Sequence, residues 1–278
     1  MPTGSRASDA PPLETDSLYF LHIPKTAGTS VTKWLADHID QEKVCPAKNW
    51  DQLVMLDQQV LLTYRIFAGH FGMDFESFLG RRITVVTLLR DPLRRTISHY
   101  QHVRRDPNHP LHQHVLHQSF EMFVMDRQNW AMIENFQARY LVTTPVEFKQ
   151  FVPCYDRNVM KRHRLSVLSE DARYLLDPAY VRDKAIESIG QRLALVGTDE
   201  FLIEFLCWIG ERLSIETSVS VRDVPRENVS PQDGVIELSA TSLEIVNTLT
   251  NIDREIYAMV RYNSVDSNGP GNEAIDAG

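Results

Sequence analysis

The chain has 278 residues, of which 43% are hydrophobic and 24% charged, values typical of a soluble globular protein with a full apolar core. Its net charge of -8 argues against a nucleic-acid-binding protein, which needs a basic surface. Its three cysteines (Cys45, Cys154 and Cys207) are widely spaced, and neither a signal-peptide core nor a run of 18 apolar residues is visible, so we expect a soluble protein of a reducing compartment.

Short apolar segments alternate with amphipathic stretches along the chain. This alternation predicts an α/β fold with a mainly parallel sheet flanked by helices, in one domain over residues 18–262. The polar ends, residues 1–17 and 263–278, are expected to be disordered tails. The predicted strands are 18–23, 65–69, 82–89 and 192–197, and the predicted helices are 29–39, 92–103, 118–126, 130–141, 158–169, 178–191, 199–213 and 241–262.

The segment HIPKTAGTS (22–30) joins the first predicted strand to a helix. Gly28 allows a tight turn, and the N–H groups of the turn and of the first helical residues can converge on an anion. Lys25 adds a positive charge, and Thr29 and Ser30 add hydroxyl donors. These features favour a phosphate-binding loop, although the Walker A pattern is absent because the lysine precedes the glycine. The alternative is an ordinary strand-to-helix turn capped by Thr29 or Ser30.

The segment LLRDPLRRTISHYQH (88–102) follows the most apolar strand. Arg90 lies at the carboxyl end of that strand, where ligands bind in open α/β sheets. Asp91 and Pro92 are typical of an N-cap and a first helical position. Ser98 lies two turns further on, so that Arg90 and Ser98 can share a ligand oxygen. The alternative is that Arg90 pairs with a surface carboxylate and Ser98 faces solvent.

Together, HIPKTAGTS and LLRDPLRRTISHY resemble the two nucleotide motifs of sulfotransferases that use 3′-phosphoadenosine 5′-phosphosulfate (PAPS), and in particular the uronosyl 2-O type of carbohydrate sulfotransferase. Weaker resemblance continues through AGHFGMDF (68–75), ENFQARYL (134–141), ALVGTDEF (194–201) and RENVS (226–230). The resemblance implies a P-loop-like α/β fold that binds PAPS and no metal. The residues it implies in donor binding are Pro24, Lys25, Thr26, Ala27, Gly28, Thr29, Ser30, Arg90, Ser98, Arg222 and Arg226.

The resemblance also implies two catalytic residues. Lys25 would stabilise charge on the leaving phosphate, and His70 would accept the proton of the acceptor hydroxyl, a role that suits an imidazole at neutral pH. A structural, hydrogen-bonded histidine is the alternative for His70. For the acceptor site we consider six residues, each with a solvated or structural role as its alternative. They are His99, His102, Arg104, Arg105, Asn135 and Arg139.

The sequence therefore predicts a PAPS-dependent sulfotransferase that acts on a hydroxyl group, most simply on a carbohydrate or glycosylated small molecule, without nucleic acid as a partner. The resembling eukaryotic enzymes usually carry a membrane anchor and disulfides, and this sequence shows neither, so a cytoplasmic enzyme is expected. Two alternatives stay open. One is a small-metabolite kinase that uses the same phosphate loop, and the other is a non-catalytic nucleotide- or glycan-binding protein of the same fold.

Overall fold

The computed structural model describes residues 17–142, 177–215 and 236–267. Its centre is one sheet of four parallel strands in the spatial order β2-β1-β3-β4. All four predicted strands are confirmed, and so is the parallel α/β architecture. The strands are β1 (Leu18–Leu21), β2 (Ile66–Gly69), β3 (Thr84–Leu89) and β4 (Leu193–Thr198).

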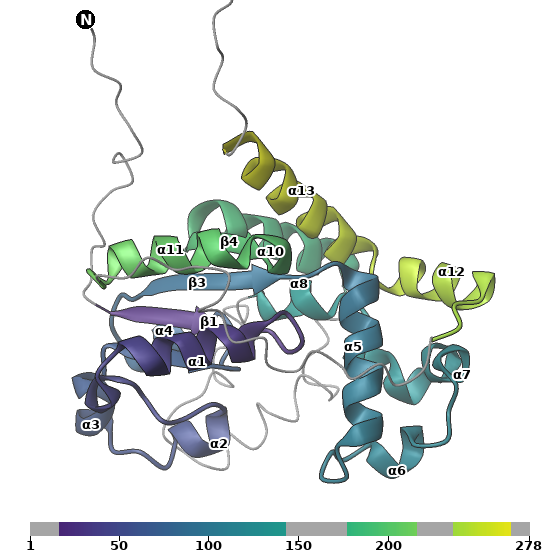
Figure 1. Cartoon of the computed structure of the whole chain (residues 1–278), viewed down its shortest axis with the longest axis horizontal. Coiled ribbons are helices and arrows are strands. Elements are labelled where there is room, and N and C mark those ends of the chain that lie inside the picture. The colour runs from purple at the N-terminus through teal and green to yellow at the C-terminus, as the bar shows by residue number, and fades with distance from the viewer. Residues whose placement is uncertain (1–16, 143–176, 216–235, 268–278) are drawn as a thin grey trace, which may run out of the picture.

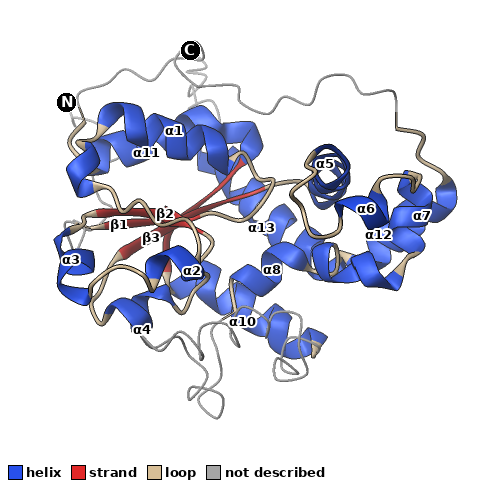
Figure 2. Ribbon diagram, turned by 90° about the horizontal axis from the view of Figure 1, so that it is seen from below, coloured by secondary structure: helices blue, strands red, loops and turns tan. Residues whose placement is uncertain are grey.

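Helices cover both faces of the sheet (Figure 2), which explains why β1, β2 and β3 are buried along their whole length. One face packs on α1 (Gly28–His38) and α11 (Leu202–Arg212), where Trp34 and Phe205 join Phe20 in one apolar cluster. The opposite face packs on α2 (Trp50–Leu53), α3 (Gln58–Thr63), α4 (Phe75–Leu79), α8 (Phe136–Tyr140), α10 (Pro178–Gln191) and α13 (Asn251–Ser267).

A separate group of helices lies beyond the carboxyl ends of the strands (Figure 1). It begins with α5, which starts directly after β3, and it has its own apolar cluster around Tyr100, Phe123 and Val246. Within the described ranges, no helix combines the length and the apolar content that crossing a membrane requires. The group consists of α5 (Pro92–Arg105), α6 (His112–Val115), α7 (Phe120–Met125), the 3-10 helix η2 (Arg127–Met132) and α12 (Ala240–Leu249).

The strand register places the functional segments at a single edge of the sheet. Leu21 at the end of β1 pairs with Gly69 of β2 and Thr87 of β3. On the side of β3 that faces β4, Leu89 pairs with Thr198 of β4. Because all four strands are parallel, the residues that follow them emerge together at the carboxyl edge, where open α/β sheets bind ligands. Those residues are His22, His70, Arg90 and Asp199.

Two of the predicted helices are wrong in extent. The single helix predicted over 241–262 is two helices, α12 and α13, which meet at Thr250, and α13 continues to Ser267. The helix predicted over 130–141 is also interrupted: η2 ends at Met132, and α8 begins after Asn135, whose φ of 39° is left-handed. The helix predicted over 158–169 lies outside the described residues.

The interruptions share one cause. Asn135 inserts at the junction of α12 and α13, where its side-chain oxygen accepts N–H bonds from Ile252 (2.9 Å) and Asp253 (3.4 Å). Its own N–H donates to the carbonyl of Leu249 (2.8 Å). Asn135 thus provides hydrogen-bond partners for backbone groups at the end of α12 and the start of α13. A contact between segments so far apart in the chain cannot be predicted from the periodicity of either helix.

Candidate active site

The predicted phosphate loop connects β1 to α1 through two left-handed residues. Lys25 has a φ of 73° and Ala27 a φ of 68°, a conformation that costs energy for any residue with a side chain. A hydrogen bond within the turn stabilises it, since the buried Thr26 hydroxyl donates to the carbonyl of Ile23 (2.9 Å). Pro24 lies in this turn, Ser30 is buried and Thr29 is exposed at the start of α1. The loop is therefore a strained segment rather than a simple capped turn.

Gly28 has a steric reason to be glycine. A Cβ atom at this position would lie 2.0 Å from Cδ2 and 2.1 Å from Nε2 of the His22 ring. The His22 ring is held on its other sides by Phe20 (ring centroids 5.6 Å apart) and His70 (4.5 Å apart). The His22 ring thus lies between Gly28 of the phosphate loop and His70, the residue that follows β2.

Arg90 joins the two predicted motifs directly. Its Nη1 donates to the carbonyl of Lys25 (3.2 Å), and its Nε lies 3.1 Å from a carboxylate oxygen of Asp199 after β4. The backbone of Arg90 is held as well, because the side-chain amide of Gln137 accepts from its N–H (2.9 Å) and donates to its carbonyl (2.8 Å). The predicted cap also forms, with Arg94 N donating to Asp91 Oδ1 (2.9 Å), and Ser98 lies half-buried further along α5.

Positive charge accumulates around Lys25. Burial, and after it the positive charges of Arg105, Arg90 and Arg95, together lower the pKa of Lys25 from 10.5 to about 8. We call Lys25 and the three arginines whose charges act on it the basic cluster: Lys25, Arg90, Arg95 and Arg105. Such a concentration of cations is costly without a negative partner, and it favours binding of an anion with several charges.

His70 has the hydrogen bond that a general base requires. Its Nδ1 lies 2.6 Å from the backbone carbonyl of His22, which can only accept, so Nδ1 carries the proton and Nε2 presents a lone pair. Burial lowers the pKa of His70, and the hydrogen bond to His22 opposes that effect only in part. The imidazole is therefore neutral at neutral pH and able to take up a proton.

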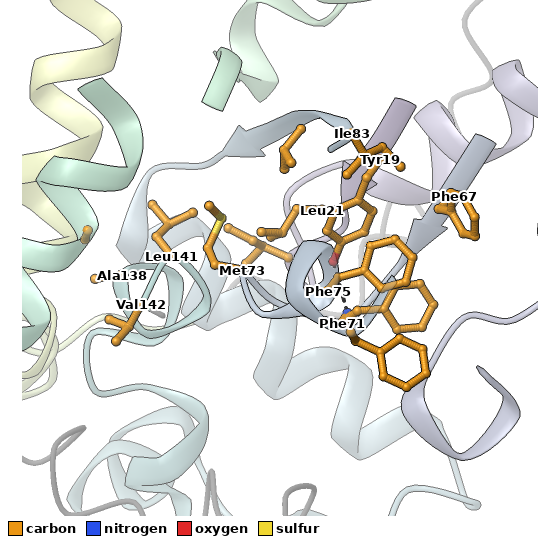
Figure 3. Packing of buried hydrophobic residues seen from close by; sticks show 14 of the residues in the cluster. Tyr19, Leu21, Phe67, Phe71, Met73, Phe75, Ile83, Ala138, Leu141 and Val142 are labelled. Carbon is orange, nitrogen blue, oxygen red and sulfur yellow. Dashed lines mark hydrogen bonds between the residues drawn. The ribbon is translucent and has the colours of Figure 1, made fainter. Parts of the chain in front are cut away.

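The chain on both sides of His70 is anchored in the core (Figure 3). Phe71 stacks on Phe75 with ring centroids 4.9 Å apart, and its N–H donates to the hydroxyl of Tyr19 (3.2 Å). The Tyr19 hydroxyl lies 3.3 Å from the carbonyl oxygens of both Gly69 and Gly72, to which it can donate. On the backbone side, His70 N donates to the carbonyl of Lys48 (2.8 Å). His70 thus has little freedom to leave the sheet edge.

Three of the six residues predicted for the acceptor, His99, His102 and Arg105, interact electrostatically with Lys25. Burial is the largest cause that lowers the pKa of His99 and His102; the charge of Lys25 comes next for His102, and for His99 it follows those of Arg95 and His109. The charge of Arg105 in turn lowers the pKa of Lys25. His99 is buried, and its Nδ1 accepts from Nη1 of Arg95 (3.1 Å), which leaves His99 neutral with its proton on Nε2.

For the other three, Arg104, Asn135 and Arg139, no effect on Lys25 is found, and each is engaged by neighbouring groups of the protein. Arg104 packs on Tyr100: its Nη1 donates to the Tyr100 hydroxyl (3.2 Å), and its guanidinium lies over the Tyr100 ring, 5.3 Å from the ring centroid. Arg139 donates to the carbonyl of Ala131, and Asn135 holds the junction described above. Arg222 and Arg226, predicted to contact the nucleotide, lie outside the described residues.

Several residues of the site were not identified from the sequence. Asp199 could have been, because it directly follows the predicted strand 192–197 and so belongs to the same sheet edge as Arg90. Gln137 was excluded by helical spacing, which placed it away from Asn135 and Arg139. Arg95 is fully buried, and the sequence did not predict this, because buried arginines are rare and no feature of the neighbouring residues distinguishes Arg95 from an exposed arginine.

Among the described residues, no group of three or more histidine, cysteine, aspartate or glutamate side chains is arranged to hold a metal ion. The comparisons with known proteins gave one match to a family model, described as the sulfotransferase family, over residues 13–177. The match covers more than half of the chain and includes the phosphate loop, His70, Arg90 and Gln137. A search of curated proteins found no match.

Proposed function

The chain belongs to the sulfotransferase family, and from this membership we propose that it transfers a sulfuryl group from PAPS to an acceptor hydroxyl on a carbohydrate or glycosylated small molecule. The observation that carries the proposal is the convergence of Lys25, His70 and Arg90 at one edge of the sheet. Arg90 Nη1 and the Lys25 carbonyl are only 3.2 Å apart, although the residues are 65 positions apart in the chain.

The residues present suit PAPS as the donor. PAPS has three charged groups, a 5′-phosphate, a sulfate and a 3′-phosphate, and these suit a site in which three arginine charges act on Lys25. Two carboxylates act on the arginines of the cluster: Asp199 pairs with Arg90, and the charge of Asp253 acts on Arg95. In this proposal Lys25 and the loop N–H groups bind the 5′ end, while Arg90 and Ser98 bind the 3′-phosphate.

The chemistry then needs positioning and charge stabilisation more than covalent participation by the protein. The acceptor oxygen forms a bond to sulfur as the bond between sulfur and the bridging phosphate oxygen breaks. The hydroxyl proton goes to Nε2 of His70, and the charge that develops on the leaving phosphate is stabilised by Lys25. Lys25→Ala should therefore reduce turnover by about 100-fold or more, while the protein stays folded.

The donor assignment is tested by thermal shift and calorimetry with 3′-phosphoadenosine 5′-phosphate (PAP), ADP and ATP. PAP should stabilise the protein and bind at least about tenfold more tightly than ADP, since only PAP has the 3′-phosphate that Arg90 would bind. Equal affinity for PAP and ADP would refute the donor. Preferential stabilisation by ATP would instead support the kinase alternative.

A further inference from the structure

A glutamine side chain replaces a peptide group next to the end of β3. The strand ends at Leu89, and at Arg90 the side-chain amide of Gln137 takes over both backbone partners, accepting from N–H at 2.9 Å and donating to the carbonyl at 2.8 Å. Few side chains can do this, because only a carboxamide carries a donor and an acceptor side by side. Both peptide groups that flank the Cα atom of Arg90 are thereby fixed.

Gln137 is itself firmly held. Its side chain is fully buried, and its own N–H donates to Oδ2 of Asp253 (3.1 Å). The next N–H, that of Ala138, donates to the other carboxylate oxygen of Asp253 (2.8 Å). Asp253 lies in α13 and is also fully buried. A continuous set of hydrogen bonds therefore runs from the last described helix to the backbone of Arg90.

Pinning the backbone has a consequence for the side chain. The guanidinium of Arg90 reaches the Lys25 carbonyl and the Asp199 carboxylate from a Cα whose orientation Gln137 fixes. A long side chain that leaves a fixed Cα loses less freedom when it binds an anion, and it binds with more directional selectivity. If the Arg90 backbone were mobile, the guanidinium could reach phosphate groups at several positions and would select less between nucleotides.

We propose that Gln137 is a positioning residue that fixes Arg90 for selective binding of the 3′-phosphate, with Asp253 setting the position of Gln137. This inference rests on the proposed function, because it assigns Arg90 to the 3′-phosphate. Gln137 does not touch the nucleotide in this scheme, and its whole effect passes through Arg90.

The test compares Gln137→Ala with Asn129→Ala. Asn129 is a matched control, since it is also a fully buried carboxamide and donates to the Phe123 carbonyl (2.9 Å) and to Gln118 (3.0 Å), but has no contact with Arg90. Gln137→Met is the second variant: it keeps most of the side-chain volume but lacks both the acceptor for the Arg90 N–H and the donor for the Arg90 carbonyl, so it carries the same test if Gln137→Ala does not fold.

The first readout needs no nucleotide. Hydrogen exchange of the Arg90 amide, followed by NMR, should accelerate about tenfold or more in the Gln137 variants compared with Asn129→Ala. An Arg90 amide protected equally in all of them overturns the proposal.

The second readout is the ratio of ADP to PAP dissociation constants, measured with and without Arg90→Ala. Gln137→Ala should reduce the preference for PAP by about fivefold to tenfold in the wild-type background, and by less than about twofold when Arg90 is absent. An equal reduction in both backgrounds, or an unchanged preference in Gln137→Ala, overturns the role of Gln137. A wild-type protein without any preference for PAP instead refutes the proposed donor, so the two failures are distinguishable.

Discussion

Raising the pH should weaken PAP binding through a single group, Lys25. Its pKa is lowered to about 8, chiefly by burial and then by the positive charge of Arg105. An anionic ligand binds the charged amine, so the contribution of Lys25 is fully present below pH 8 and is lost as the pH rises through that value. A carboxylate would change the affinity in the same direction as it ionises, but an ordinary carboxylate does so near pH 4, well below this range.

The magnitude follows from the pKa. An amine with a pKa of about 8 is roughly nine-tenths charged at pH 7 and roughly one-tenth charged at pH 9, so the apparent affinity for PAP should fall about tenfold over that range if only the charged form binds. Phosphate groups have their second pKa near 6, so they are already about nine-tenths ionised at pH 7 and add little slope between pH 7 and 9. Burial lowers the pKa of His70, His99 and His102, which therefore stay neutral and contribute no slope.

Calorimetric titration with PAP at pH 7, 8 and 9 measures the effect, and Lys25→Arg is the control. A guanidinium stays charged at pH 9, so this variant should bind PAP with little dependence on pH. The control also separates Lys25 from Lys48, another lysine whose pKa burial lowers. An affinity that is flat in the wild type, or that falls equally in Lys25→Arg, would show that Lys25 is not the titrating group and would remove it from the phosphate site.

Three further predictions test the remaining parts of the site. His70→Ala should keep near-normal affinity for PAP and lose transfer by about 100- to 10,000-fold in initial-rate assays, and the wild-type rate should rise with pH through a pKa below 6.5, because burial favours the neutral base. Arg90→Ala should bring the dissociation constants of PAP and ADP to within about threefold of each other by calorimetry, whereas a retained preference would assign the 3′-phosphate elsewhere. Gly28→Ala places a Cβ 2.0 Å from the His22 ring and should lower the free energy of unfolding, measured in urea, by about 1–3 kcal/mol, partly offset by the roughly 1 kcal/mol that alanine gains over glycine in a helix. In a His22→Ala background the Gly28→Ala change should be neutral or stabilising. Losses of stability that simply add in the double variant would count against the contact.

The sheet and its ligand edge were predictable because they depend on local composition. Runs such as TVVTLL are apolar along their whole length only when both faces are covered, and Asp91 with Pro92 marks a helix start within a few residues of sequence. The parallel order then places Lys25, His70 and Arg90 at one edge without further information. The prediction of four parallel strands that align these segments at one edge is confirmed.

The helix breaks and the supports of the site depend on contacts between distant segments. Asn135 adopts a left-handed conformation because its side chain serves the junction at Thr250, more than 100 residues away. Gln137 faces Arg90 only because α8 is a short helix placed by Asp253. Periodicity treats each segment as a continuous helix and cannot detect such partners, so the residues that hold the site were assigned to the acceptor or left out.

We propose that this sheet edge transfers a sulfuryl group from PAPS with His70 as the base. The most direct test of this proposal is transfer of labelled sulfate from PAPS to a panel of glycans, glycosides, phenols, sterols and lipids, performed with the wild type and with folded His70→Ala at saturating PAPS. We predict label on a hydroxyl of a carbohydrate-containing acceptor in the wild type, and a loss of about 100-fold or more in His70→Ala with PAP binding retained. Equal transfer by both proteins, or loss of PAP binding together with activity in the variant, would contradict the assignment.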